Sequence, residues 1–272
     1  MRLIFLLVIF AQTAWAQGDL FLAVRKNNVK AAEKSLALGV NVNAADDKGL
    51  VPLHYAAAYN YPEMVKWLLA HGADVNKTNK WLWTPLHYAL GCDHVTDKLC
   101  PKPDPERTLA VVKLLVEAKA NVNAADDHGV SPVFLASDDL KILKYLQEHG
   151  GCVDSGYAYR GQTPLHFAIS SEASAENIKF ILQNGGRDKI NSFDGDGYAP
   201  LHRAVQFGNL NAVKLLVEYG ANINLARDID ECETPLEMAE EAKQTEIVKY
   251  LKAHGAIHKK STIKNQAGTA SP

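Results

Sequence analysis

Apolar and polar residues alternate along most of the chain with the spacing of short amphipathic helices. Residues 62–69, Pro-Glu-Met-Val-Lys-Trp-Leu-Leu, are a clear example, and residues 212–216, Ala-Val-Lys-Leu-Leu, repeat the pattern. A glycine, which favours a left-handed helix end, follows most of these segments: Gly39, Gly72, Gly150, Gly185, Gly220 and Gly255. Lys119 takes this place once, at a cost of about 1 kcal/mol. The pattern therefore predicts a series of short helices separated by tight turns.

A six-residue motif recurs ahead of these helices. It reads Thr-Pro-Leu-His-Phe-Ala at residues 163–168, with further copies at 51–56, 84–89, 199–204 and 234–239 and a degraded copy at 131–136. Its prolines lie at positions 52, 85, 132, 164, 200 and 235, so the copies are 33, 47, 32, 36 and 35 residues apart. Threonine can cap a helix, and proline suits the first helical position, where no N–H is needed. The motif therefore predicts the start of a further helix in each repeat.

A period near 33 residues with the sequence Thr-Pro-Leu-His-x-Ala resembles the ankyrin repeat. The resemblance covers about residues 19–256. It implies an all-α ankyrin-repeat solenoid of about seven helix–turn–helix repeats, joined by β-hairpin-like loops. In that family the motif histidine bonds to backbone and threonine oxygens and ties neighbouring turns together. We therefore interpret four histidines as structural rather than as a metal or catalytic cluster: His54, His87, His166 and His202.

The repeats are expected to form one domain over residues 17–257. Their bounds are about 19–45, 46–78, 79–125, 126–156, 157–192, 193–227 and 228–257. Residues 92–106 lack helical periodicity and contain three prolines, which predicts an inserted loop before a second helix that runs from Arg107 to Glu117. Ser137-Asp138-Asp139 replaces a helix junction and predicts a truncated first helix. Residues 258–272 are polar and are expected to be a disordered tail.

The N-terminal residues 1–16 have the features of a secretory signal peptide. Arg2 is followed by an apolar run over residues 3–11, and Ala14-Trp15-Ala16 offers a cleavage site between small residues. The run is short for a bilayer span, so an uncleaved anchor is the less favoured alternative. We expect a mature chain that begins at Gln17, contains no membrane span, and is secreted or periplasmic.

Composition and charge exclude some function classes. The chain has 272 residues, 47% of them hydrophobic, and a formal net charge of −2. It has no basic stripe for nucleic acid. It also lacks a nucleophile elbow, a phosphate-binding loop and a zinc-protease motif, so we expect no enzyme activity and no cofactor. The insertion holds possible metal ligands without a recognised spacing: Asp93, His94, Asp97, Asp104 and Glu106.

The cysteines and one asparagine leave covalent chemistry open. In an oxidising compartment the spacing of Cys92 and Cys100 suggests a local disulfide. Cys152 and Cys232 lie more than two repeats apart, so we expect buried thiols or, less favoured, pairing between chains. Asn76-Lys77-Thr78 matches the N-glycosylation sequon, which matters only in a eukaryotic secretory pathway.

The resemblance implies a non-catalytic protein-binding scaffold or regulator that acts through the concave surface of hairpin tips and outward residues of first helices. The alternatives are an exported effector that binds a host protein, and a metal-binding or enzymatic accessory that uses the 92–106 loop. We expect an unknown protein partner, no nucleic acid and a monomer. The candidate partner-binding residues are Lys48, Tyr55, Tyr59, Trp81, Trp83, Tyr88, His128, Tyr159, Arg160, Phe167, Tyr198 and Arg203.

The second and third repeats hold the densest group of candidates, in which Trp81 and Trp83 flank Leu82. Leu82 stands where the turn normally has a glycine. Residues 80–83 are therefore expected to expose a large apolar area at the expense of favourable turn geometry. These aromatic residues would then supply affinity, and polar tips in repeats four to six would supply specificity. The alternative is that the aromatic rings pack on one another or on the neighbouring hairpin.

Overall fold

The computed structural model describes residues 17–91, 104–153, 158–227 and 233–258. The chain divides into two compact units, unit 1 (Met1–Asp127) and unit 2 (His128–Pro272). The regular structure of the described residues is helical, apart from an isolated bridge between Ala158 and Gln162. In these residues no helix is both long and apolar enough to cross a membrane.

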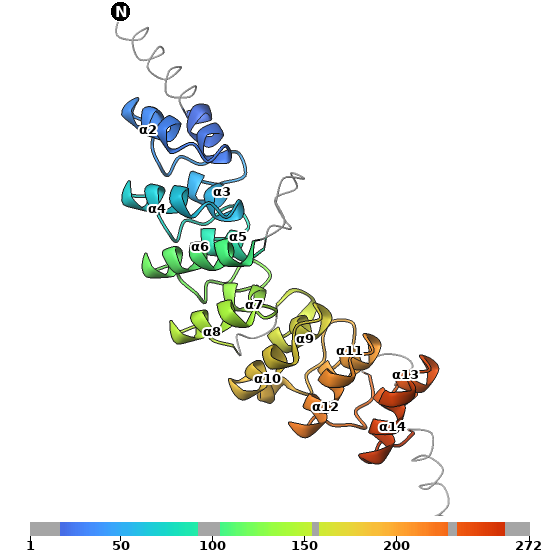
Figure 1. The fold of residues 1–272 in the computed structure, drawn as a ribbon. Helices are drawn as coiled ribbons and strands as arrows, with labels where there is room; N and C mark the ends of the chain where they lie inside the picture. The colour runs from blue at the N-terminus through green and yellow to red at the C-terminus, as the bar shows by residue number, and fades with distance from the viewer. Residues whose placement is uncertain (1–16, 92–103, 154–157, 228–232, 259–272) are drawn as a thin grey trace, which may run out of the picture. The chain divides into compact units, whose positions relative to one another are not determined.

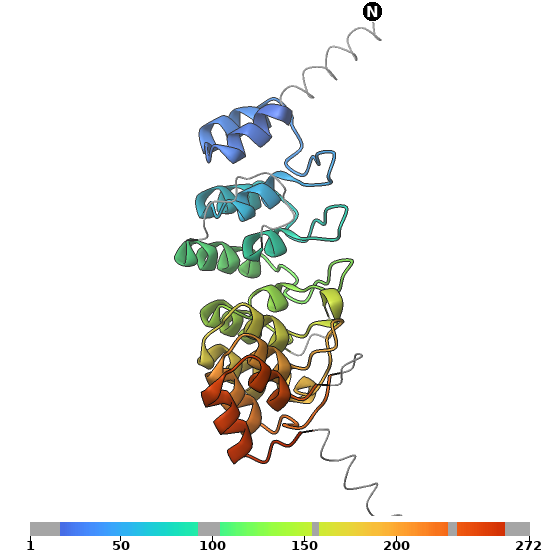
Figure 2. The same ribbon diagram turned by 90° about the vertical axis from the view of Figure 1, so that its right-hand side faces the viewer.

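Unit 1 is built from pairs of antiparallel helices. Residues 17–25 are helical and precede α2 (Val29–Ala37), α3 (Pro52–Ala58) is followed by α4 (Pro62–Ala70), and α5 (Pro85–Leu90) is followed by α6 (Pro105–Glu117). In Figure 1, α2, α4 and α6 form one row, and α3 and α5 form a second row beside it. Figure 2 shows that the loops between the pairs of this unit project from one side of the helices.

Unit 2 repeats the arrangement with four pairs. They are α7 (Pro132–Leu135) with α8 (Leu140–Glu148), α9 (Pro164–Ser170) with α10 (Ala175–Gln183), α11 (Pro200–Gln206) with α12 (Leu210–Glu218), and α13 (Pro235–Glu241) with α14 (Thr245–Ala253). Short 3₁₀ helices, η1 (Tyr159–Gly161) and η2 (Gly186–Lys189), lie in two connections. First helices pack on first helices, as α9, α11 and α13 do, and second helices pack on second helices. Each interface is therefore local to neighbouring pairs.

The recurring motif starts each first helix as its chemistry predicts. Thr163 Oγ1 accepts a hydrogen bond from the backbone N of His166 at 3.3 Å, and the backbone N of Thr163 donates to His166 Nδ1 at 3.3 Å. His166 Nε2 then reaches the carbonyl oxygen of Tyr198, in the next hairpin, at 3.0 Å. His54 Nε2 reaches the carbonyl oxygen of Trp83 in the same way, also at 3.0 Å. The structural interpretation is confirmed for these two histidines.

Burial keeps three of the four motif histidines neutral. It lowers the pKa of His54, His166 and His202, each to about 4. Because Nδ1 of His54 accepts a backbone N–H, the single ring proton resides on Nε2, which donates to the carbonyl of the next hairpin. The neutral ring is thus the form that links neighbouring repeats.

The helix ends agree with most of the predicted signals. All six predicted glycines have positive φ, between 84° and 119°, and Lys119 has φ 71°. Helix α7 has four residues, which confirms the predicted truncation. The predicted start of α6 at Arg107 was two residues late, because Asp104 caps the helix by accepting from the backbone N of Glu106 at 3.1 Å and Pro105 occupies the first position. Asp104 is therefore a helix cap rather than a loop ligand.

Several sequence predictions concern residues outside the described ranges. They include the signal peptide, the tail beyond residue 258, Cys232, the Cys92–Cys100 disulfide and three of the loop ligands, Asp93, His94 and Asp97. The fifth loop ligand, Glu106, lies in the first turn of α6. Cys152 is described, and its side chain is exposed, which corrects the expectation of a buried thiol.

Asn76, the sequon asparagine, joins two repeats of unit 1. Its side-chain nitrogen donates to the carbonyl oxygen of Lys119 at 3.0 Å, and its side-chain oxygen accepts from the backbone N of Asn121 at 2.7 Å. Asn43 makes the same two kinds of bond one repeat earlier, to Gly72 and Asp74. A structural role therefore explains an asparagine at position 76 without glycosylation.

Candidate partner-binding surface

A polar side chain at the base of three hairpins holds the tip in shape. Asp46 Oδ1 accepts hydrogen bonds from the backbone N–H groups of Lys48 and Leu50, both at 2.9 Å. Asn79 and Asp194 make the same two bonds, to the residues two and four positions later, at 2.9–3.0 Å. A short side-chain acceptor that bonds its own following backbone is a well-known way to close a turn. The hairpin backbone is therefore fixed before any partner arrives.

The remaining polar atom of each of these three residues bonds to a side chain nine positions later, in the following first helix. We call these bonds the hairpin clasps. The pairs are Asp46 Oδ2 with Tyr55 Oη (2.6 Å), Asn79 Nδ2 with Tyr88 Oη (2.8 Å) and Asp194 Oδ2 with Arg203 Nε (2.7 Å). Each clasp ties a hairpin to its own helix, so the tip cannot swing independently.

The hairpin clasps give three of the candidate partner-binding residues a structural role. Tyr88 and Arg203 are only 1% and 9% exposed, so the expectation that they offer contact area to a partner is corrected. Tyr55 is half-buried. Burial, reinforced by its bond to the Asp46 carboxylate, raises its pKa, so the hydroxyl remains a donor. The spacing of nine residues from Asp or Asn to Tyr or Arg was visible in the sequence, but sequence reasoning missed it.

Trp83 is a structural residue as well. It is 4% exposed, and its Nε1 donates to Asp126 Oδ2 at 2.7 Å. Its ring meets Tyr88 edge to face, with centroids 5.3 Å apart, and lies 5.4 Å from the ring of His87. The prediction of an exposed anchor at Trp83 is therefore wrong, and packing against the neighbouring hairpin, the alternative, is the arrangement found.

Trp81 and Leu82 remain exposed, at 40% and 49%, and we call this pair the 81–82 tip. Leu82 has φ 62°, in the left-handed region, where the corresponding residues of other hairpins are Gly49 and Gly197 with φ 81° and 73°. A bulky residue in this conformation costs roughly 1–2 kcal/mol relative to glycine. The bonds of Asn79 hold the strained turn, and the backbone N of Lys80 donates to the carbonyl oxygen of Lys48 at 3.2 Å.

Tyr59 and Lys48 complete the candidates of unit 1. Tyr59 is half-buried, and its ring is stacked on Tyr61 with centroids 5.6 Å apart. Lys48 is half-buried at the tip next to the 81–82 tip. Only part of each side chain is therefore accessible to a partner. The 81–82 tip is more exposed than the other aromatic candidates of this unit.

In unit 2, two guanidinium groups lie over the ring of Tyr198. The Cζ atoms of Arg203 and Arg227 lie 4.4 Å and 3.8 Å from its ring centroid. Arg203 also pairs with Asp194 and Asp196, at 2.6 Å and 2.7 Å. This network spans two hairpins, and its charges are largely compensated, so it is better suited to holding the tips than to attracting a charged ligand.

The other candidates of unit 2 are spread more widely. His128 and Arg160 are exposed, and Arg160 lies 3.8 Å from Asp196. Phe167 is half-buried against the cluster of Val130, Phe134 and Ala158, with its ring centroid 5.0 Å from that of Phe134. The side chain of Tyr159 is not among those described. Apolar packing thus replaces the polar clasp in this part of the unit.

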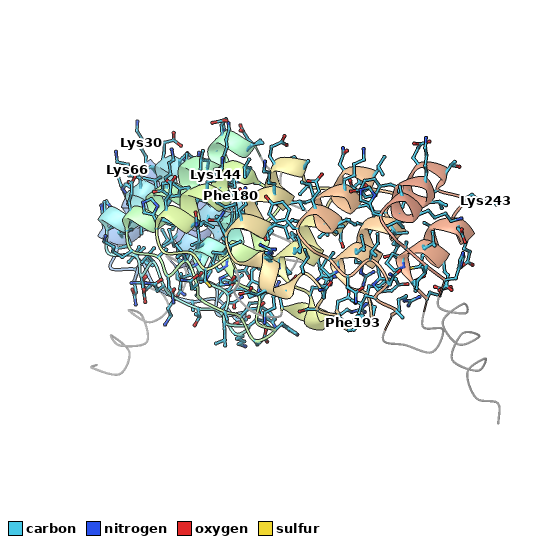
Figure 3. All side chains as sticks on the ribbon, turned by 90° about the horizontal axis from the view of Figure 1, so that it is seen from below. Lys30, Lys66, Lys144, Phe180, Phe193 and Lys243 are labelled. Carbon is cyan, nitrogen blue, oxygen red and sulfur yellow. The ribbon has the colours of Figure 1, made fainter. Side chains whose placement is uncertain are left out.

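The second helices carry exposed lysines that sequence reasoning did not single out. The fifth residue of α4, α8, α10, α12 and α14 is lysine in each case: Lys66, Lys144, Lys179, Lys214 and Lys249. Figure 3 shows Lys144 beside Phe180, whose ring centroid lies 5.7 Å from Nζ. Every one of these helices also carries a glutamate, so the face has mixed charge and is best explained by solubility.

Comparison with known proteins agrees with this geometry. A family model described as ankyrin repeats in three copies matches residues 105–194, 151–227 and 187–263. Two further models, for many copies and for a single copy of the ankyrin repeat, match residues 36–89 and 81–127. These matches overlap most of the described helices.

Relatives among curated proteins align with the repeat region of this chain. The chain is 30% identical to human palmitoyltransferase ZDHHC13 over 245 residues, which cover 88% of this chain and 36% of that protein. It is 30% identical over 179 residues to the ankyrin repeat protein FPV223 of fowlpox virus (strain NVSL), covering 65% of this chain and 91% of that protein. The chain thus spans only about a third of the length of the palmitoyltransferase relative.

A solved structure shows the same fold. The crystal structure of the ankyrin repeat domain of Bcl-3, a member of the IkappaB protein family, superposes with a TM-score of 0.63 at 23% sequence identity. The superposition covers 85% of this chain and 97% of that domain. With its all-α solenoid fold and the matching family models, the chain belongs to the ankyrin repeat family.

Proposed function

We propose that this chain is a non-catalytic protein-binding scaffold or regulator that acts outside the cytosol. Membership of the ankyrin repeat family supports a protein partner. The charged start, apolar run and small-residue cleavage pattern of residues 1–16 support export. The partner lies along the hairpin tips, with the 81–82 tip as the main contact.

The observation that carries this proposal is the strained exposure of Leu82. Glycine would relieve the left-handed backbone at this position, and a polar residue would avoid exposing apolar surface. The chain instead places leucine there, beside the exposed ring of Trp81. A costly local conformation that presents apolar area to solvent is typical of a binding contact.

The polar side chains support a binding module better than an enzyme. Asp46, Asn79 and Asp194 are committed to hairpin backbones and clasps. Both ring nitrogens of His54 and of His166 are bonded within the fold. These groups are therefore occupied with structure, and none of them is positioned as a nucleophile or general base.

Site-specific photo-crosslinking tests the proposal. A photoreactive amino acid replaces exposed Asp47 or Arg160 at the hairpin tips, or exposed Lys66 or Lys144 on second helices as matched controls. The mature chain, residues 17–272, is then irradiated in the native extracytoplasmic fraction. We expect one protein to be cross-linked from the tips and not from the controls. Cross-links confined to the second helices, or none from any position, would contradict the proposal.

The exported-effector alternative predicts the same pattern of cross-links with a protein from a host extract. The alternative that uses the 92–106 loop has lost one ligand, because Asp104 caps α6.

A further inference from the structure

Three lysines lie in the two hairpins that meet at the 81–82 tip. Lys77 and Lys80 are exposed in the same hairpin, and Lys48 is half-buried in the neighbouring one. The two hairpins are in direct contact, because the backbone N of Lys80 donates to the carbonyl oxygen of Lys48. None of the three lysines forms an ion pair with a described residue. Within the described part of the chain, the two hairpins therefore carry a patch of three lysines that are not held in ion pairs.

Acidic residues lie on either side of this patch in unit 1. Asp47 is exposed next to Lys48. Asp127 is exposed and directly follows Asp126, the residue that holds the indole of Trp83. The tips of unit 1 therefore present an acidic group, then a basic and apolar group, then a second acidic group.

The tip is also preorganised. Asn79 Oδ1 accepts hydrogen bonds from the backbone N–H groups of Trp81 and Trp83. The hydrogen bond from Trp83 Nε1 to Asp126 fastens this hairpin to the next one. A side chain carried on a backbone that is already fixed loses less conformational entropy on binding. The exposed pair is thus a rigid apolar projection rather than a flexible loop.

We propose that the 81–82 tip inserts into an apolar socket on the partner protein, and that carboxylates on the rim of this socket face Lys48, Lys77 and Lys80. This inference rests on the proposed protein-binding function and specifies the chemistry of the partner. Burial of Trp81 and Leu82 supplies the hydrophobic contribution, while rim carboxylates orient the partner and exclude basic competitors.

A tryptophan, a leucine and several lysines at one loop tip would also suit an anionic membrane surface. The flanking carboxylates of Asp47 and Asp127 argue for a protein. Insertion of the tip into a flat anionic surface would press both carboxylates against like charge, whereas a protein surface can match alternating charge residue by residue.

A displayed library of random peptides tests the inference directly. Selection is performed on the mature chain, with counter-selection on the Trp81→Ala/Leu82→Gly variant. The most enriched peptide is then titrated against wild type, Leu82→Gly, Lys80→Glu and, as a control on a second helix of the other unit, Lys144→Glu. We expect enriched peptides to place aromatic or aliphatic residues next to Asp or Glu, and both tip variants to weaken binding by roughly tenfold or more. The control should bind as wild type does, and added salt should weaken wild-type binding.

Leucine-to-glycine replacement restores the residue type of the other tips, so loss of binding by this variant is not explained by unfolding. Enriched peptides without acidic residues, peptides that bind Leu82→Gly as tightly as wild type, or no enrichment at all would overturn the inference. Sedimentation with phosphatidylcholine vesicles that contain phosphatidylserine should leave the chain in solution, and binding that requires Leu82 would assign the tip to membranes instead. A partner protein could be cross-linked from the tips while the selected peptides bind the tip variants as tightly as wild type. That result would overturn this inference and leave the proposed function standing.

Discussion

The indole Nε1 of Trp83 donates a hydrogen bond to Oδ2 of Asp126 across 2.7 Å, and both residues are buried. The bond joins the end of one hairpin to the base of the next, in the same unit. It separates two tryptophans that are only two positions apart, because Trp83 stabilises the stack while Trp81 projects into solvent. Trp83 therefore has a structural role, and Trp81 stays accessible for the proposed contact with a partner.

Loss of this bond should destabilise the chain. Trp83→Phe keeps an aromatic ring but leaves the buried Asp126 carboxylate without its indole donor, so we expect a loss of about 2 kcal/mol in the free energy of unfolding. Urea unfolding followed by circular dichroism measures it. Trp81→Phe is the matched control, since its ring is partly exposed and should change stability by less than about 0.5 kcal/mol. Equal effects of the two substitutions would show that the bond is unimportant.

The clasp of unit 2 should tolerate exchange for the type found in unit 1. Arg203→Met leaves the buried Asp194 carboxylate without its ion pair, and we expect a loss of about 3–5 kcal/mol. Arg203→Tyr restores an Asp–Tyr clasp like that of Asp46 and Tyr55, so it should retain more stability than Arg203→Met. Urea unfolding of the two variants compares their free energies of unfolding. A tyrosine variant no more stable than the methionine variant would mean that the clasp geometry is not transferable.

Acid should destabilise the fold through three of the motif histidines, His54, His166 and His202. Their pKa is about 4 in the native chain against 6.5 for an unburied ring. Between these values the unfolded chain binds protons that the native chain does not, so stability is fully present above pH 6.5 and falls as the pH drops towards 4. At about pH 5 the loss is about 2 kcal/mol per histidine. Unfolding free energies at about pH 7 and about pH 5 measure the slope.

His54→Gln provides the control for this pH dependence. It should lower stability at neutral pH because it removes bonds to Val51 and Trp83. It should also reduce the difference between the neutral and acidic measurements by the share of one histidine. A difference as large as that of wild type would show that other groups cause the acid sensitivity.

The sequence was sufficient for the fold because the repeat motif specifies local events. Proline and threonine start helices, glycine ends them, and a short junction at residues 137–139 truncates α7. The sequence was less informative about which side chains are exposed at the surface. Residue type alone could not separate Trp81 from Trp83, because their burial depends on whether Asp126, far along the chain, offers an acceptor. Tyr88 and Arg203 were misjudged for the same reason, since each bonds a hairpin residue nine positions earlier.

A comparison of two glycine substitutions tests the central claim most directly. Leu82 and Lys119 both adopt the left-handed conformation, with φ 62° and 71°, so Leu82→Gly and Lys119→Gly should each maintain or raise stability by up to about 1 kcal/mol. Only Leu82 belongs to the 81–82 tip. We expect Leu82→Gly to weaken binding of the protein cross-linked at position 47 by roughly tenfold or more, and Lys119→Gly to bind as wild type does. Wild-type affinity in Leu82→Gly would show that the tip is not the main contact.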